Sequence, residues 1–162
     1  MFILNFNKFA ETVSLNFTKE ERTKMLLKIE NVKQKQLSTD EQYKFIFDQL
    51  KLSDKKTFMP LESLIMKGFQ NIQKKYGPNI DSQIFTNATA KVQEKLPKNN
   101  ARMDDGCGFR FGLCAGSVGF QGGLLLAACE AVTAGVATPL CLAGAVIYAA
   151  DGVAECRDKY CD

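Results

Sequence analysis

Residues 107–161 read CGFRFGLCAGSVGFQGGLLLAACEAVTAGVATPLCLAGAVIYAADGVAECRDKYC and carry the strongest structural signal in the chain. This stretch contains every cysteine of the protein: Cys107, Cys114, Cys129, Cys141, Cys156 and Cys161. Of the forty residues from Phe111 to Ala150, only Glu130 is charged. Cysteine at about one residue in ten of a short segment is typical of a disulfide scaffold. The sequence therefore predicts a small disulfide-bonded effector domain over residues 103–162.

The spacing of the six cysteines favours one pairing without excluding the others. Six cysteines allow fifteen pairings, and sequence alone does not choose among them. In a helical hairpin, however, paired positions have numbers with a constant sum. Positions 129 and 141 sum to 270, as do 114 and 156, while 107 and 161 sum to 268. The bonds expected for such a nested hairpin are Cys129–Cys141, Cys114–Cys156 and Cys107–Cys161.

The turn of this hairpin is expected at Gly135. A glycine can end a helix, and Pro139 suits the first turn of the next one. Helix axes usually lie ~8–10 Å apart, whereas a disulfide needs Cα atoms ~4.4–6.8 Å apart, so the facing side of each arm should carry small residues. A row at i+4 spacing offers them on the first arm: Gly119, Gly123, Ala127, Ala131 and Gly135. The alternative is that a segment this rich in Gly and Ala contains such a row by composition alone.

Glycines also bear on the continuity of the first arm. Gly119, Gly122 and Gly123 fall within little more than one turn, and each should weaken a water-exposed helix by ~1 kcal/mol. We therefore expect two separate helices, Phe109–Gln121 and Leu124–Ala134. Glu130 could line a polar pore or pair with a basic residue, but we favour a position that faces solvent or ends a helical turn.

Upstream of this segment the chain has a different composition. Residues 1–102 contain no cysteine and hold 18 Lys/Arg against 11 Asp/Glu, a net charge of +7, whereas residues 103–162 hold 3 against 7, a net charge of −4. Opposite charges favour intramolecular contact between the two parts. The alternative is that each set of charges only keeps its own part soluble. We expect a helical leader or immunity-like domain at 1–96 and a linker at 97–102.

Amphipathic patterns in the first part predict helices. One is expected over residues 18–36 with Thr18 as its cap, and Ser38 with Glu41 forms a capping-box pattern that opens a second. A third helix is expected to begin at Pro60, after a connection over Asp54–Met59, and to stop at Gly77. A fourth covers residues 82–96, and residues 1–9 form either a short strand or the first turns of a packed helix. The predicted class is all-α: an N-terminal helical bundle followed by a small disulfide-stapled helical hairpin.

The linker is the expected site of processing. Pro97 ends the preceding helix, and polar residues follow up to the change of composition at Met103. Because proteolysis concentrates in exposed loops, we expect cleavage in the segment that contains Lys98, Arg102 and Met103. No export signal is recognisable at the start of the chain, which lacks a basic beginning and has its apolar run interrupted by asparagines.

The sequence gives little support to catalysis. It has no histidine, which removes Ser-His and Cys-His nucleophile pairs and every histidine metal site. It also lacks Cys-x-x-Cys, a phosphate-binding loop and a dinucleotide fingerprint. The lysines are spread over several predicted helices instead of forming one basic cluster with a reading element. We expect no enzyme activity, no cofactor, no metal site and no nucleic-acid partner.

The cysteine set of residues 103–162, in a Gly/Ala-rich and nearly uncharged segment behind a longer cysteine-free region, resembles the precursors of the small cysteine-rich halocin-type bacteriocins. The resemblance covers residues 103–162 only. It implies a C-terminal antimicrobial that is secreted after processing, and an N-terminal part that is cytoplasmic or membrane-associated and serves as leader or immunity partner. The nested pairing is also similar to that of saposin-like proteins, which disturb or carry lipids.

Two functions from different classes remain. The first is a bacteriocin-like precursor whose C-terminal peptide acts on the lipid membrane of target cells. The second is a non-toxic membrane-associated helical-hairpin protein with a cytosolic binding domain. Val136–Ala150 is an uncharged stretch of fifteen residues, fewer than the ~20 that span a bilayer, so insertion after a conformational change is easier than permanent spanning.

Overall fold

The structure, a computed structural model that describes residues 2–48, 55–77 and 109–161, contains six helices and no strand in those ranges. They are α1 (Phe2–Asn16), α2 (Lys19–Lys33), α3 (Thr39–Asp48), α4 (Lys55–Tyr76), α6 (Phe109–Thr133) and α7 (Thr138–Tyr160). The predicted all-α class is confirmed. The fourth expected helix at 82–96, the linker at 97–102 and the processing residues Lys98, Arg102 and Met103 lie outside the described residues.

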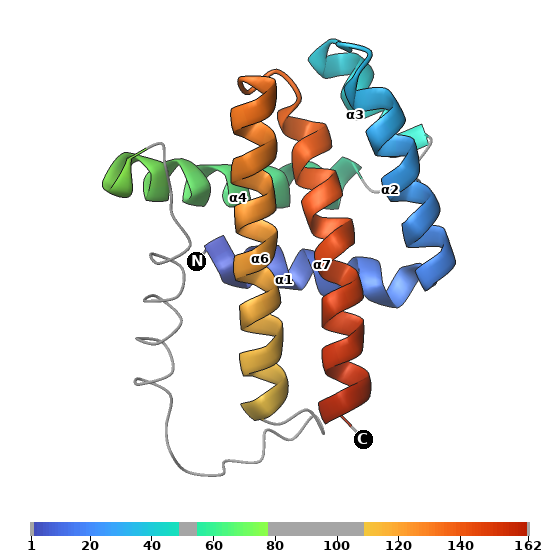
Figure 1. The fold of residues 1–162 in the computed structure, drawn as a ribbon, viewed down its shortest axis with the longest axis vertical. Coiled ribbons are helices and arrows are strands. Elements are labelled where there is room, and N and C mark those ends of the chain that lie inside the picture. The colour runs from blue at the N-terminus through green and yellow to red at the C-terminus, as the bar shows by residue number, and fades with distance from the viewer. Residues whose placement is uncertain (1, 49–54, 78–108, 162) are drawn as a thin grey trace.

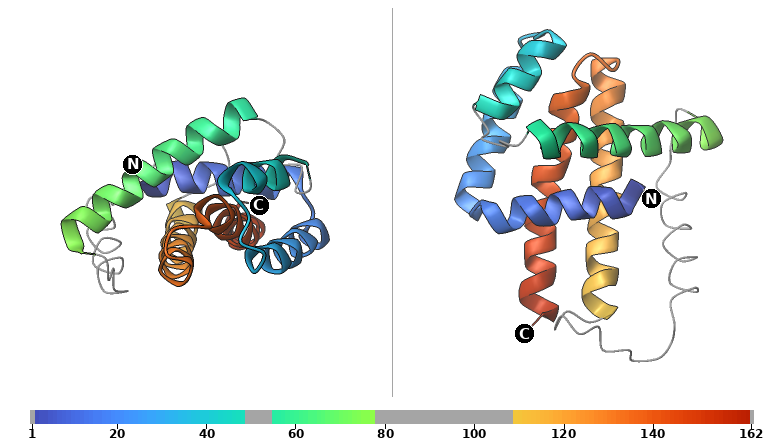
Figure 2. Two further views of the ribbon diagram at one scale, coloured as in Figure 1. Left: turned by 90° about the horizontal axis from the view of Figure 1, so that it is seen from above. Right: turned by 180° about the vertical axis from the view of Figure 1, so that it is seen from behind.

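The helices form layers around a C-terminal hairpin. Helices α6 and α7 run side by side and antiparallel, and α1 crosses them almost at right angles (Figures 1 and 2). Helix α4 packs on α1, while α2 and α3 lie along the side of α7 that is away from α6. The first residues of the chain are thus helical, the second of the two alternatives for residues 1–9.

Helix α7 is the central element of this arrangement. It contacts α6, α1, α2 and α3, and twelve of its 23 residues are buried. Its sequence allows this because positions 138–150 carry no charge and are mostly Ala, Leu, Val and Ile. One hydrophobic core joins it to large side chains of the N-terminal helices: Phe6, Phe9, Met25, Ile29, Ile46, Ile65 and Phe69. The two compositionally different parts of the chain therefore share a core.

Two helix starts are fixed by the expected side-chain caps. The Thr18 main-chain N–H donates to the Glu21 carboxylate at 2.8 Å, and the Glu21 N–H donates to the Thr18 hydroxyl at 3.3 Å. The same reciprocal pair occurs between Ser38 and Glu41, with the same two distances. Each box satisfies N–H groups that a helix start leaves without partners, so the starts of α2 and α3 could be placed from the sequence.

The start of α4 differs from the expectation. The helix begins at Lys55, so residues 55–59 of the expected connection are helical and Pro60 lies in the second turn, while Asp54 is outside the described residues. Pro60 is the sixth residue of the helix, beyond the first four N–H groups that have no partner inside it, so the proline removes one intrahelical hydrogen bond, the one to the carbonyl of residue 56. The end is as expected: Gly77 has a φ of +88° and its N–H donates to the Gln73 carbonyl at 2.8 Å.

The division of the first arm into two helices is wrong. Phe109–Thr133 is a single helix that includes Gly119, Gly122 and Gly123, all of them buried. A Cβ atom on Gly119 would collide with the side chain of Asn7, and one on Gly122 would collide with the ring of Phe6. The penalty assumed for these glycines applies to exposed positions. Here the missing side chains let α1 cross the hairpin closely, and that packing supports the helix.

The hairpin turns at the predicted place. Gly135 has a φ of +77°, and its N–H donates to the Glu130 carbonyl at 3.0 Å, the six-to-one bond of a Schellman ending. The preceding residue, Ala134, also has a positive φ, of 51°. One carboxylate oxygen of Glu130 is buried and has no hydrogen-bond partner among the described residues.

Ala134→Gly should raise the free energy of unfolding by about 1 kcal/mol, since an L-residue in the left-handed region costs about that much and glycine does not. Urea unfolding of the oxidised chain measures the change. Gly135→Ala is the matched control and should lower stability by a similar amount through the backbone alone, because its nearest neighbour, a Glu130 oxygen, would be 3.6 Å from the new methyl. A destabilised Ala134→Gly would contradict the left-handed assignment.

Candidate functional site: a covered and disulfide-stapled apolar hairpin

Two disulfides join the arms of the hairpin. Cys114 is bonded to Cys156, with Cα atoms 5.7 Å apart, and Cys129 to Cys141, with Cα atoms 5.6 Å apart. These are the two inner bonds that nesting about Gly135 requires. Cys161 is disulfide-bonded as well, and Cys107 lies outside the described residues. One staple thus lies near the turn and the other near the open end.

The small residues that permit this close approach are not those of the predicted row. Between the staples, Val118 of α6 lies against Gly152 of α7, where a Cβ would come within 2.8 Å of both valine methyls. Gly119 instead faces α1, since it lies about 100° around the helix from Val118. At the other end of the row, Ala131 and Gly135 are exposed. The row Gly119, Gly123, Ala127, Ala131 and Gly135 therefore does not form one stripe between the arms.

Both arms are long and apolar enough to cross a membrane. The window at Arg110–Thr133 has a mean hydropathy of 1.5 and that at Thr138–Tyr160 has 1.3. Length and composition are weak evidence, because a buried core helix passes the same test. The arms differ in this respect: 67% of the α7 window is buried, as in a core helix, but only 28% of the α6 window is.

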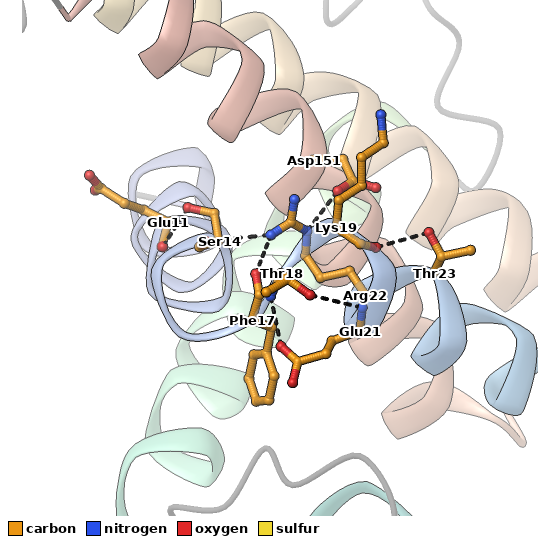
Figure 3. Close-up of polar contacts among 9 residues, drawn as sticks. All are labelled: Glu11, Ser14, Phe17, Thr18, Lys19, Glu21, Arg22, Thr23 and Asp151. Carbon is orange, nitrogen blue, oxygen red and sulfur yellow. Dashed lines mark hydrogen bonds and ion pairs between the residues drawn. The ribbon is translucent and has the colours of Figure 1, made fainter.

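A buried ion pair ties α7 to the N-terminal helices. The Arg22 side chain, on α2, is only 5% exposed, and its Nε lies 2.6 Å from Oδ1 of Asp151 on α7. Its Nη1 donates to the main-chain carbonyls of Phe17 and Ser14 at the junction of α1 and α2. Figure 3 shows the guanidinium directed between that junction and α7. This arginine thus joins α1, α2 and α7 at one point.

Two further polar contacts hold the hairpin. Arg157 of α7 donates to the Glu11 carboxylate of α1 at 3.2 Å, in a more exposed position. At the turn, the buried Gln42 of α3 donates through Nε2 to the Val136 carbonyl at 2.8 Å and to the Leu37 carbonyl at 3.0 Å. Sequence reasoning missed Arg22, Glu11 and Gln42, because nothing distinguishes them from other polar residues of amphipathic helices.

A buried carboxyl joins α3 to α4. The Tyr43 hydroxyl lies 2.8 Å from each carboxylate oxygen of Glu62, which is itself buried. Burial raises the pKa of Glu62 above its ordinary value of 4.5, although the hydrogen bond from Tyr43 acts in the opposite direction. Burial and the neighbouring Glu62 also raise the pKa of the Tyr43 hydroxyl.

Glu62→Gln should make the protein more stable at pH 7, with a difference that shrinks as the pH falls. A raised folded-state pKa means that the native carboxyl takes up a proton more readily than the unfolded one. In the wild-type protein, the stabilising effect of the Glu62 carboxyl is therefore complete below pH 4.5 and is lost as the pH rises through the folded-state pKa. Urea unfolding of both proteins between pH 4 and pH 8 measures the difference. A difference that widens towards acid would contradict this sign.

The described residues do not form a metal site. Within residues 2–48, 55–77 and 109–161, no three side chains of His, Cys, Asp or Glu are grouped so that they could hold a metal ion. The features of the site are two apolar helices that disulfides hold together: α7, which is mostly buried, and α6, which is largely uncovered.

No protein-family model, curated protein or solved structure matches the chain.

Proposed function

We propose that the chain is a bacteriocin-like antimicrobial precursor. After processing in the segment 97–102, the disulfide-bonded C-terminal peptide is secreted and acts on the membranes of target cells. The N-terminal part is its leader or immunity partner and keeps the hairpin covered until then. The observation that supports this most directly is the position of α7: an apolar helix of the C-terminal part whose cover comes from α1, α2 and α3 of the N-terminal part.

The cover and the staples have separate consequences. If α1, α2 and α3 leave, the apolar residues of α7 lose their neighbours, and apolar surface of this extent must meet lipid, a partner or another copy. The two disulfides lie within the hairpin, so they stay with it and keep its arms paired. Separation would thus yield a compact apolar hairpin instead of an unfolded peptide.

Two ion pairs connect the hairpin to the N-terminal helices that would have to leave it. Asp151 and Arg157 of the hairpin pair with Arg22 and Glu11 of the N-terminal part. The Arg157–Glu11 pair is partly exposed, and such pairs contribute little net free energy in water. The rest of the cover depends on apolar packing and on the buried Arg22–Asp151 pair. A lipid surface can replace apolar packing, and water can replace the outer ion pair.

One observation favours the alternative function, a membrane-associated protein that is not toxic. Helix α6 is apolar and largely uncovered in the intact chain, so contact with lipid does not require processing. In this alternative the intact chain stays with membranes and the N-terminal helices bind a cytosolic partner.

Controlled cleavage of the whole chain distinguishes the two. A recognition site for a specific protease, inserted within residues 97–102, allows the oxidised chain to be cut in the presence of dye-loaded vesicles. We expect leakage after cutting, little before it, and suppression when excess separately produced residues 1–96 are added. Inhibition of the growth of sensitive cells should follow the same order.

The control is the same insertion with a scrambled recognition sequence, which the protease leaves intact. Cut chain that separates from its N-terminal part on gel filtration with lipid, yet neither releases dye nor inhibits growth, would contradict the antimicrobial proposal. Leakage by the uncut chain equal to that of the cut chain would contradict the restraint.

A further inference from the structure

One side of α6 is an uncovered apolar surface. We call its members the α6 outer face: Leu124, Leu125, Ala128, Ala131 and Val132, which lie together near the end of the helix, with Leu113 on the same side beyond the exposed polar Ser117 and Gln121. Val132 is 88% exposed. No residue from Phe111 to Cys129 is charged, and the exposed Arg110 stands at the start of the helix.

This surface differs from the other exposed apolar residues of the protein. Leu27 of α2, for example, is 61% exposed, but Lys24 and Glu30 are exposed within one turn of it. Single apolar side chains among charges are normal on soluble proteins. The α6 outer face instead gathers five apolar side chains within about two and a half turns, from Leu124 to Val132.

The outer face lies on the open side of the hairpin. Gly122 contacts α1, and Leu124 lies about 200° around the helix from it. Seen from above, no described helix covers the side of the hairpin opposite α1 and α4 (Figure 2, left). On the neighbouring arm, the exposed Tyr148 lies about half a turn around α7 from Arg157, which bonds α1. Its ring, apolar with one polar end, suits a membrane–water boundary.

The area of the face distinguishes between two binding partners, a second copy of the chain and a lipid surface. A helix face of nine residues is about 14 Å long and about 10 Å wide and offers roughly 140 Å², whereas stable interfaces bury ~800 Å² on each partner. A lipid interface has no such threshold, because an apolar helix face is taken up ~5–10 Å deep in the plane of the headgroups. None of the five members of the face is charged.

We infer that the intact chain binds lipid surfaces through the α6 outer face, while α7 stays covered by the N-terminal helices. This inference concerns the uncut chain and holds whether or not a released hairpin is toxic. It separates the roles of the two arms: α6 provides the contact with lipid and α7 remains in the protein core.

The test uses the oxidised full-length chain and vesicles of phosphatidylcholine, with and without phosphatidylglycerol. We expect binding to both in flotation assays, with little loss at high salt, and no dye leakage. Val132→Glu should weaken the partition coefficient about tenfold, because it places a charge where an apolar side chain meets acyl chains. Leu27→Glu is the matched control, an exposed apolar residue outside the face, and should change binding less than about twofold.

A fluorescence reporter locates the contact, since the chain contains no tryptophan. Val132→Trp should shift its emission to the blue when vesicles are added, and Leu27→Trp should not. Binding that requires phosphatidylglycerol and is unaffected by Val132→Glu would overturn the inference in favour of the basic N-terminal part. A lipid-free dimer that Val132→Glu dissociates would overturn it in favour of a second copy.

Failure here and failure of the antimicrobial proposal are distinguishable. Binding of the uncut chain without leakage after cutting supports the inference and contradicts the antimicrobial function. Leakage after cutting, by a chain that does not bind lipid before it, overturns the inference alone.

Discussion

Replacing Cys114 and Cys156 together by alanine is expected to lower the free energy of unfolding by about 4 kcal/mol, and replacing Cys129 and Cys141 by about 3 kcal/mol. The order follows from the loops that the bonds close, with sequence separations of 42 and 12 residues. A longer closed loop removes more conformational freedom from the unfolded chain. Urea unfolding under oxidising conditions measures both losses.

The same variants in reductant provide the control. With all bonds open, each should unfold within about 1 kcal/mol of reduced wild type, because only small packing changes remain. Under oxidising conditions, a larger loss of stability without Cys129–Cys141 than without Cys114–Cys156 would contradict the loop argument. It would indicate that strain or residual structure, and not chain freedom, sets the contribution of these bonds.

Asp151→Ala is expected to cost about 3 kcal/mol, the low end for breaking a buried ion pair from one side. The side chain of Arg22 would remain at 5% exposure without its carboxylate partner, while that of Asp151 itself is 28% exposed. Two carbonyls would still accept from the guanidinium, but they do not neutralise its charge. Thermal and urea unfolding of the oxidised chain give the loss.

Asp158→Ala is the matched control, because Asp158 is an exposed acid on the same helix. Removing it should change stability by less than about 0.5 kcal/mol. Equal effects of the two substitutions would show that the carbonyls alone hold Arg22. If the pair does help to keep the hairpin covered, Asp151→Ala should also increase vesicle leakage by the cut chain.

The parts of this fold that sequence could predict are local. The Thr18 and Ser38 boxes use groups three residues apart, and the turn needs only Gly135 and the proline after it. The order of the inner disulfides follows from the same turn, since a hairpin aligns positions symmetrically about it. Each of these rests on distances along the chain that are read without knowledge of other helices.

The parts that could not be predicted depend on partners far away in sequence. The glycines of α6 suggested a break only because nothing indicated that Phe6 and Asn7 would lie against them. Arg22 is one of 21 basic residues, and its carboxylate partner is 129 positions away. The start of α4 before Pro60 was missed for a different reason, since the prediction placed this proline at the first helical position, whereas it is the sixth residue of the helix.

The central position of α7 has a consequence for biosynthesis. It is the last described helix to leave the ribosome, roughly 4–17 seconds after α4 at ~5–20 residues per second, yet α1, α2 and α3 need it to bury their apolar sides. The nascent N-terminal segment should therefore depend on chaperones until α7 has emerged. Made without its tail, it should remain incompletely folded and become ordered only on capturing a hairpin from another molecule.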